Sequence, residues 1–189
     1  TVFPSSFQYP CVFDDGIQKP NAEKWSSYDL ELCGGGNPKN DVKFLSQVID
    51  ELKQKYAVDE KRIYIVGFSN GGEMASRTAI ELSGKIAAVV ACAGALPVDT
   101  SFTPVRKLPV LLQVGNADDK LLARLGTPNP LPMDFVQLFA DFPAVQEVAN
   151  TFINAFSLNT IYTTGGDANT ILYADYTGTS GKPENVFRF

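Results

Sequence analysis

The sequence places a serine between glycines at the end of a short apolar run, and no other feature constrains the fold as much. Residues 63–66 (Ile-Tyr-Ile-Val) have the composition of a buried strand, and a helical pattern occupies residues 71–82. Between them, residues 67–71 (Gly-Phe-Ser-Asn-Gly) fit the pattern G-x-S-x-G. A strand, a tight turn and a helix in this order form the setting in which hydrolases expose a nucleophilic serine at the carboxyl end of a parallel sheet.

The rest of the chain alternates apolar runs with helical patterns. Helices are expected over residues 38–56, 71–82 and 144–156, and strands over 63–66, 86–91, 110–114, 171–176 and 186–189. Residues 4–37 are expected to be irregular, between a strand tail at Val2–Phe3 and a helix cap at Asn37. Apolar strands that alternate with helices predict an α/β fold, in which a mostly parallel sheet is covered by helices on both faces.

The composition excludes several classes of protein. The 189 residues suffice for one domain, 44% of them are apolar, and no apolar run approaches the roughly 20 residues of a membrane span. The net charge is −5 and the basic residues are scattered, so we expect no nucleic-acid partner. With no histidine and three separated cysteines, we expect no metal site. Asp14-Asp15-Gly16 lacks the regular oxygen spacing of a calcium loop.

The three cysteines differ in their surroundings. Cys92 lies in an apolar run and is expected to be a small buried residue. Cys11 and Cys33 lie in loop-like segments and could form a disulfide, although spacing alone does not decide pairing. A disulfide would indicate an oxidising compartment.

The turn around Ser69 has the residue types that a nucleophile elbow needs. Small neighbours at Gly67 and Gly71 would relieve the crowding of a sharp turn, and the serine hydroxyl would then stand exposed. The next helix begins behind the serine, so the backbone N–H of Asn70 would point at a developing oxyanion. The alternative is a glycine-rich turn whose serine only caps the helix.

Three longer stretches carry a resemblance to a known family: NDVKFLSQVIDELKQKYAVDEKRIYIVGFSNGGEMA, IAAVVACAGAL and PVLLQVGNADD. Over roughly residues 38–118 they resemble the polyhydroxybutyrate depolymerase-type esterases, a branch of the α/β-hydrolases that includes feruloyl and acetylxylan esterases. The resemblance implies a single α/β-hydrolase (esterase-like) domain over residues 1–189, incomplete at both ends. It also implies a secreted, extracellular serine carboxylic ester hydrolase that forms an acyl-serine intermediate with a small or polymeric ester and uses no cofactor.

The resemblance also assigns two catalytic residues. It makes Ser69 the nucleophile, and Asp118, which follows the strand expected at 110–114, matches the acid. Asp119 is the alternative acid if the register slips by one residue. An aspartate just past a strand end is also a common helix cap, which is the competing explanation of Asp118.

Two regions could shape a substrate pocket. By resemblance, Trp25 and Tyr28 lie near the mouth of the site, and Phe68 lies beside the serine. Packing of their own loop explains Trp25 and Tyr28 equally well. The proline-punctuated segment 119–143 could be a lid or insertion, and packing against the sheet is again the competing explanation.

The base of the expected triad is missing, because the chain contains no histidine. The family places its histidine after the last strands and an oxyanion loop before the first ones, and neither is found here. Together these absences predict an internal fragment of a longer esterase that is inactive by itself. The alternatives are a catalytically inactive hydrolase-fold binding protein and a serine peptidase of the same fold. The sequence makes no prediction of the oligomeric state.

Overall fold

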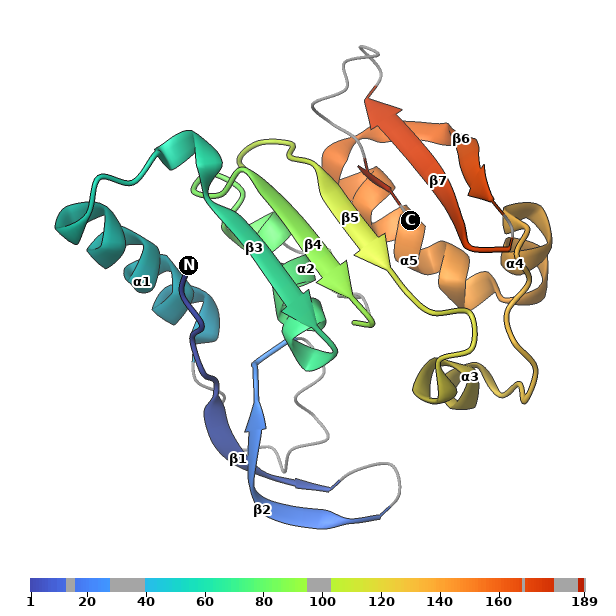
Figure 1. Ribbon diagram of the computed structural model, residues 1–189, viewed down its shortest axis with the longest axis horizontal. Coiled ribbons are helices and arrows are strands. Elements are labelled where there is room, and N and C mark those ends of the chain that lie inside the picture. The colour runs from blue at the N-terminus through green and yellow to red at the C-terminus, as the bar shows by residue number, and fades with distance from the viewer. Residues whose placement is uncertain (13–15, 28–39, 95–102, 168, 179–186, 189) are drawn as a thin grey trace.

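The computed structural model describes residues 1–12, 16–27, 40–94, 103–167, 169–178 and 187–188. The strands are β1 (Phe7–Val12), β2 (Gln18–Lys24), β3 (Tyr64–Phe68), β4 (Ala88–Cys92), β5 (Val110–Gln113), β6 (Leu158–Asp167), β7 (Ile171–Gly178) and β8 (Phe187–Arg188). The helices are α1 (Asp41–Lys55), α2 (Asn70–Glu81), α3 (Asp119–Leu125), α4 (Phe135–Asp141) and α5 (Pro143–Phe156), with a short 3-10 helix, η2 (Glu60–Arg62). Strands β3 to β8 form one sheet in the order β3-β4-β5-β8-β7-β6, and β1 pairs with β2 as a separate hairpin (Figure 1).

Four adjacent strands of the six-stranded sheet run parallel. β3, β4, β5 and β8 are parallel neighbours, and Phe68, Cys92 and Gln113 lie in one row across the first three of them. β7 and β6 continue the sheet as an antiparallel hairpin. Figure 1 shows the arrows of β3, β4 and β5 pointing the same way. The predicted α/β fold with a mostly parallel sheet is confirmed.

Strand β8 is only two residues long, and side chains help to hold it in the sheet. Arg188 Nε and Nη2 donate to Asp175 Oδ1 and Oδ2 of β7 at 2.6 and 2.7 Å. The Arg188 guanidinium also lies 3.9 Å from the ring centroid of Tyr173. The hydrogen bond with Asp175 raises the pKa of Arg188. Bidentate contacts of this kind are among the stronger polar interactions in proteins.

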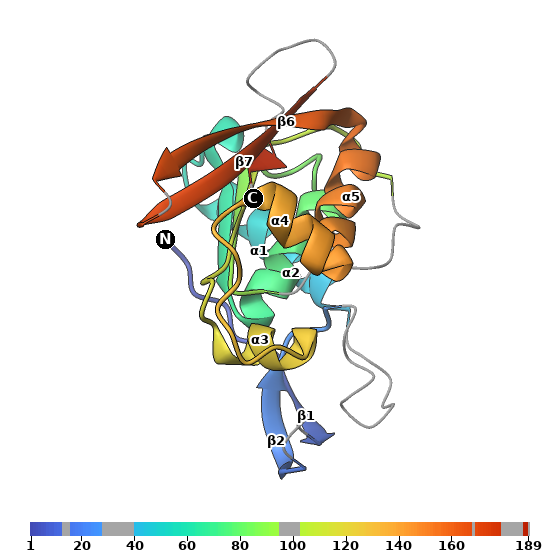
Figure 2. The ribbon, with the colours of Figure 1, turned by 90° about the vertical axis from the view of Figure 1, so that its right-hand side faces the viewer.

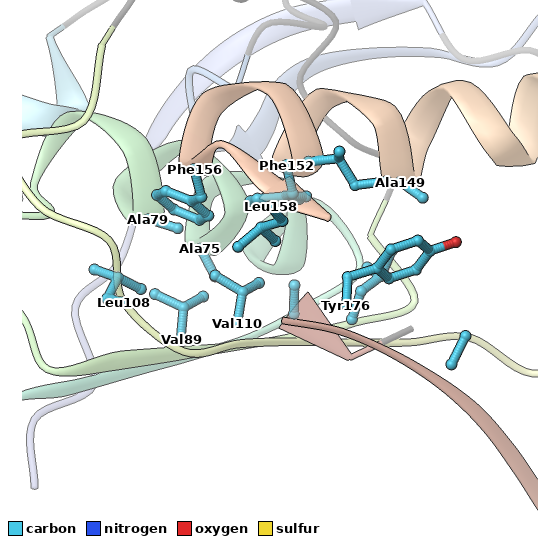
Figure 3. Packing of buried hydrophobic residues seen from close by; sticks show 14 of the residues in the cluster. Ala75, Ala79, Val89, Leu108, Val110, Ala149, Phe152, Phe156, Leu158 and Tyr176 are labelled. Atoms are coloured by element: carbon cyan, nitrogen blue, oxygen red, sulfur yellow. The ribbon is translucent and has the colours of Figure 1, made fainter. Parts of the chain in front are cut away.

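The core lies between the sheet and the helices that cover one of its faces. Figure 3 shows Phe152 and Phe156 of α5 packed above Val89 and Val110 of the sheet. These four side chains are at most 2% exposed. Phe152 and Phe156 are four residues apart and therefore share one face of α5. Burial of each such side chain contributes roughly 1.5–3 kcal/mol.

The opposite face of β3, the terminal strand of the sheet, is open in the part of the chain that the structure describes. Tyr64, Val66 and Phe68 of β3 are 60%, 72% and 73% exposed. In Figure 2, α2 and α5 stand on the same side of the sheet. The prediction of a sheet covered on both faces is therefore wrong at β3, among the described residues. A short apolar run indicates a strand but does not tell how many of its faces are covered.

The N-terminal region has regular structure that the sequence did not predict. β1 and β2 lie within residues 4–37, which we expected to be irregular, and Val2–Phe3 belongs to no strand. Pro10 of β1 coincides with a register shift between Tyr9 and Cys11. A proline cannot donate to a ladder and is tolerated in strands at edges and bulges. A two-stranded hairpin has only edge strands, so its prolines do not prevent pairing.

Helix α1 begins later than expected. Asn40 caps it, with Oδ1 accepting from Lys43 N at 2.9 Å. The expected cap, Asn37, lies outside the described residues. The apolar face of the helix is present, since Val42 and Ile49 are buried in the main core.

Segment 119–143 contains α3 and α4. Phe135, Leu138 and Phe139 are buried in the main core, and both phenylalanines meet Tyr162 of β6 edge-on. These contacts are the packing that we considered as the alternative to a lid or insertion. A lid movement of this segment stays a prediction.

Candidate active site

Ser69 occupies a strained turn between β3 and α2. Its φ of 53° and ψ of −125° lie in a backbone region that residues other than glycine rarely adopt. Ser69 N donates to Cys92 O of β4 at 2.9 Å, and Ser69 O accepts from Gly72 N at 2.8 Å and Glu73 N at 3.0 Å. Strain of this kind persists only where the surroundings over-determine it. A strained serine between strand and helix is the conformation expected of a nucleophile elbow.

Two glycines close to this turn are sterically required. A Cβ at Gly67 would lie 1.9 Å from Gly71 O, and a Cβ at Gly72 would lie 2.7 Å from Cys92 O. A Cβ at Gly71 would meet no atom closer than 4.0 Å. The expectation that Gly71 relieves crowding is therefore wrong. Gly72 has that role, because it lets the first turn of α2 approach the end of β4.

The Ser69 hydroxyl does not cap α2. Ser69 is the N-cap residue, but its side chain makes no capping hydrogen bond, which contradicts the alternative of a merely capping serine. The backbone N–H of Asn70, the first residue of α2, donates to no group in the described part of the chain. An unpaired N–H at the start of a helix is a ready donor to an anionic oxygen.

The Asn70 side chain anchors the segment that carries Trp25. Asn70 Oδ1 accepts from Trp25 N at 2.6 Å, and Nδ2 donates to Trp25 O at 3.4 Å and to Ser27 Oγ at 3.1 Å. The indole of Trp25 stacks on Phe44 of α1, with ring centroids 6.5 Å apart and 23° between the planes. The half-buried Trp25 therefore lies beside the first turn of α2. Tyr28, the neighbouring pocket residue in our prediction, lies outside the described residues.

A buried carboxylate completes this network. Glu73 is 8% exposed, and its Oε2 accepts from Asn70 Nδ2 at 2.8 Å and from Ser27 Oγ at 2.9 Å. Its Oε1 lies 4.0 Å from Arg124 Nη1 of α3. Glu73 was not among the predicted site residues. The available signal was an acidic residue in the first turn of a helix that otherwise begins with small and apolar residues.

Ser26 ties the same segment to α1. Ser26 N donates to Asp41 Oδ2 at 2.7 Å, and Arg77 Nη1 of α2 donates to Ser26 O. Asp41 is fully buried, and its second oxygen has no hydrogen-bond partner. Residues 25–27 form no helix or strand. Side chains of α1 and α2 therefore supply many of the hydrogen bonds that their backbone N–H and C=O groups need.

Asp118 follows β5, the second strand along the sheet from β3. Its Oδ1 accepts from the backbone N–H groups of Lys120 and Leu121, both at 3.0 Å, so Asp118 caps α3 as the competing explanation required. Its Oδ2 accepts no hydrogen bond from the described residues. Asp119, the alternative acid, is the exposed first residue of α3. Because a carboxylate has two oxygens, a cap leaves the second one available.

Phe68 lies apart from the Trp25 network. It is the last residue of β3, and it follows Gly67, which faces the first turn of α2. Successive residues of a strand point to opposite faces, so Phe68 projects from the open face of the sheet. The structure thus brings Trp25 to the elbow through Asn70 and places Phe68 on the other side of the strand.

The cysteines follow the expectations in part. Cys11 is disulfide-bonded, and Cys33 lies outside the described residues. Cys92 is free and half-buried, where we expected it to be buried. Within the described ranges, no three His, Cys, Asp or Glu side chains gather closely enough to hold a metal ion. No helix in those ranges has the length and apolarity to cross a membrane.

The sequence of the part that holds Ser69 is similar to sequences of known esterases. A family described as Phospholipase/Carboxylesterase matches residues 37–127, just under half of the chain and a stretch that includes both Ser69 and Asp118. A protein named "Putative esterase NocK" from Nocardia uniformis subsp. tsuyamanensis is 39% identical over 98 residues, which are 51% of this chain and 28% of that protein. The chain is therefore similar to carboxylesterases over the part that holds the elbow.

Two fungal enzymes show the same similarity. The bifunctional acetylxylan esterase/xylanase XynS20E of Neocallimastix patriciarum is 36% identical over 81 residues, which are 43% of this chain and 12% of that protein. Feruloyl esterase B of Piromyces equi is 32% identical over 115 residues, 59% of this chain and 20% of that protein. The chain spans less than a third of the length of each of these relatives. With the family match, the sheet and its helices are those of an α/β-hydrolase core, as predicted.

Proposed function

We propose that this chain carries the nucleophile and the acid of a serine carboxylic ester hydrolase. The observation that carries the proposal is the backbone of Ser69, whose φ of 53° and ψ of −125° hold the residue between a parallel strand and a helix. The Ser69 hydroxyl makes no capping hydrogen bond, and the strained backbone of the half-buried serine is the one that a nucleophile elbow requires.

In the proposed reaction, Ser69 Oγ attacks the ester carbonyl carbon and its proton passes to a histidine. The tetrahedral oxyanion accepts a hydrogen bond from Asn70 N–H. Collapse of the intermediate expels the alcohol, which takes the proton from the histidine, and leaves an acyl-serine. Water then attacks the acyl-serine with the same base, which releases the carboxylic acid and restores Ser69.

Asp118 is the proposed partner of that histidine. Phe68, Cys92 and Gln113 share one row of the sheet, so Ser69 and the residues after Gln113 start from the same edge. Two strand spacings separate them, roughly 10 Å. An imidazole placed between the two could contact both. The 189 residues contain no histidine, so we propose that the base belongs to a longer chain that includes them.

The substrate class and compartment are further parts of the proposal. Three relatives are named as an esterase, an acetylxylan esterase and a feruloyl esterase, which supports a carboxylic ester as substrate. The resemblance to polyhydroxybutyrate depolymerase-type enzymes adds polymeric esters to the candidates. The disulfide at Cys11 supports a secreted protein, because disulfides persist in oxidising compartments.

The test is an ester hydrolysis assay on two proteins: these 189 residues alone and the whole reading frame that contains them. We expect the whole protein to hydrolyse p-nitrophenyl acetate, Ser69→Ala to abolish the activity, and the 189 residues alone to be inactive. Asp118→Asn should lower kcat about 10⁴-fold, as loss of a triad acid does. Whole-protein activity that survives Ser69→Ala would contradict the proposal.

The absence of histidine favours one second candidate, a hydrolase-fold protein that binds without catalysis. The same experiment separates the two. A whole reading frame that lacks histidine and shows no turnover of p-nitrophenyl acetate would support the binding protein.

A further inference from the structure

Glu73 is the charged residue in the hydrogen-bond network that joins the first turn of α2 to Trp25 and Ser27. Neither the proposed triad nor the proposed oxyanion hole gives this buried carboxylate a role. A carboxylate that is 8% exposed pays a large desolvation cost unless polar partners satisfy it. Its Oε2 has two partners, Asn70 Nδ2 and Ser27 Oγ. Both partners belong to the contact between the start of α2 and the Trp25 segment, residues 25–27. The carboxylate is therefore placed where these two parts of the chain meet.

Asn70 has two functions in this arrangement. Its backbone N–H is the proposed oxyanion donor, and its side chain holds both backbone polar groups of Trp25. A side-chain amide can rotate, and the acceptors of Nδ2 keep Oδ1 directed at Trp25 N. Trp25 O at 3.4 Å and Ser27 Oγ at 3.1 Å are two of these acceptors, and the Glu73 carboxylate is nearer than either. Glu73 Oε2, at 2.8 Å, is the charged acceptor among them.

The opposite oxygen of Glu73 reaches a third part of the chain. Its Oε1 lies 4.0 Å from Arg124 Nη1, and Arg124 belongs to α3, the helix that Asp118 caps. One carboxylate thus contacts the elbow helix, the Trp25 segment and the helix that follows the proposed acid. Arg124 is 44% exposed, so this third contact is the weakest of the three.

We propose that Glu73 is a positioning residue, which fixes the Asn70 side chain and through it holds the Trp25 segment and the Asn70 N–H in place beside Ser69. This proposal rests on the proposed function for its catalytic consequence. The positioning itself is independent of catalysis, because it concerns contacts within the described chain.

Trp25 is the only tryptophan of the chain, so its fluorescence reports on this segment alone. In Glu73→Ala and Asn70→Ala, we expect a red-shifted emission and about a two-fold larger acrylamide quenching constant, because an indole freed from its anchor becomes accessible to solvent. Glu73→Gln should keep the wild-type emission, because its amide oxygen can still accept from Asn70 and Ser27.

The control variant is Asp175→Asn, which weakens the bidentate contact with Arg188 in β8 and leaves the Trp25 segment untouched. It should lower stability without changing the emission of Trp25. Should Glu73→Ala not fold, Ser27→Ala removes a single hydroxyl from the same carboxylate and should raise the quenching constant as well. Unchanged emission in Asn70→Ala and Ser27→Ala would overturn the proposal.

The catalytic consequence is measured in the whole protein. Glu73→Ala should lower kcat about tenfold with little change in KM, because a misplaced oxyanion donor weakens only the transition state. Glu73→Gln should restore kcat to within about two-fold of wild type. If the whole protein hydrolyses no ester, the proposed function fails while the fluorescence result still decides the positioning. If it hydrolyses esters and Glu73→Ala keeps kcat, the positioning has no catalytic consequence.

Discussion

At Ser69 the backbone adopts a conformation that its own side chain opposes. Glycine reaches this region of φ and ψ without steric cost, and serine and alanine do not. We expect the free energy of unfolding of the Ser69→Gly variant to be about 1 kcal/mol higher than that of Ser69→Ala, because glycine relieves the backbone strain. Urea denaturation of both variants measures the difference. Equal stabilities would show that the turn carries no strain.

The glycines near Ser69 permit a matched test of sterics. Gly67→Ala and Gly72→Ala should each lower the free energy of unfolding by about 2 kcal/mol, because the added Cβ would overlap backbone atoms. Gly71→Ala is the control and should be neutral or slightly stabilising, because its Cβ has room and alanine favours a helix. A destabilised Gly71→Ala with an unaffected Gly72→Ala would contradict this assignment.

The sequence predicted the role of Ser69 but not those of Gly72 and Glu73. Ser69 follows from a local pattern, and the structure gives it the backbone of an elbow. The steric role of Gly72 does not follow, because it depends on Cys92, which is distant in the sequence. Glu73 was missed for a similar reason, since its acidic position in the first turn of a helix is a weak signal and its partner Ser27 joins the site only when the chain folds.

Among the elements, the two faces of the sheet make unequal contributions to stability. Val66 of β3 is 72% exposed, and Val89 of β4 is 1% exposed. Val→Thr nearly keeps the shape and replaces one methyl group with a hydroxyl, so its cost depends on whether that hydroxyl is buried. We expect Val66→Thr to change the free energy of unfolding by less than about 0.5 kcal/mol. Val89→Thr should lower it by roughly 1–3 kcal/mol, because the hydroxyl would be buried. Equal losses, measured by urea denaturation, would mean that the open face is covered.

The elements also show where sequence patterns are sufficient. α2 and α5 were predicted nearly to their ends, because both have clear apolar spacing. β6 was missed, since Leu158–Asp167 contains Gly165 and Gly166, which indicate a turn. In the structure both glycines lie in the strand, and a Cβ at Gly165 would meet the Tyr173 side chain at 2.4 Å. Space for an aromatic ring of the neighbouring strand is not visible in a local pattern.

For the whole molecule, the pH dependence of stability should reflect Tyr176. It is 2% exposed, and burial raises its pKa to about 12, with the nearby Tyr162 adding to the effect. The unfolded chain loses this proton near pH 10. The stabilising contribution is thus complete below about pH 10 and is lost as the pH rises from 10 to 12.

We therefore expect Tyr176→Phe to lose less thermal stability than wild type between about pH 9 and pH 11. The measurement is the melting temperature by circular dichroism at each pH. Tyr56→Phe is the control, because Tyr56 is 65% exposed, and it should follow the wild-type curve. Parallel curves for Tyr176→Phe and wild type would rule out this contribution.

The open face of β3 bears on how the 189-residue protein behaves at high concentration. β3 is the terminal strand of its sheet, so an exposed apolar row and an unpaired backbone edge coincide among the described residues. Such edges recruit other chains, and like charge between molecules opposes this. The net charge of −5 provides some repulsion near neutral pH, and it vanishes near the isoelectric point of about 4.7. Purification and crystallisation of the chain are therefore best kept well above that pH, where precipitation competes least with the folded protein.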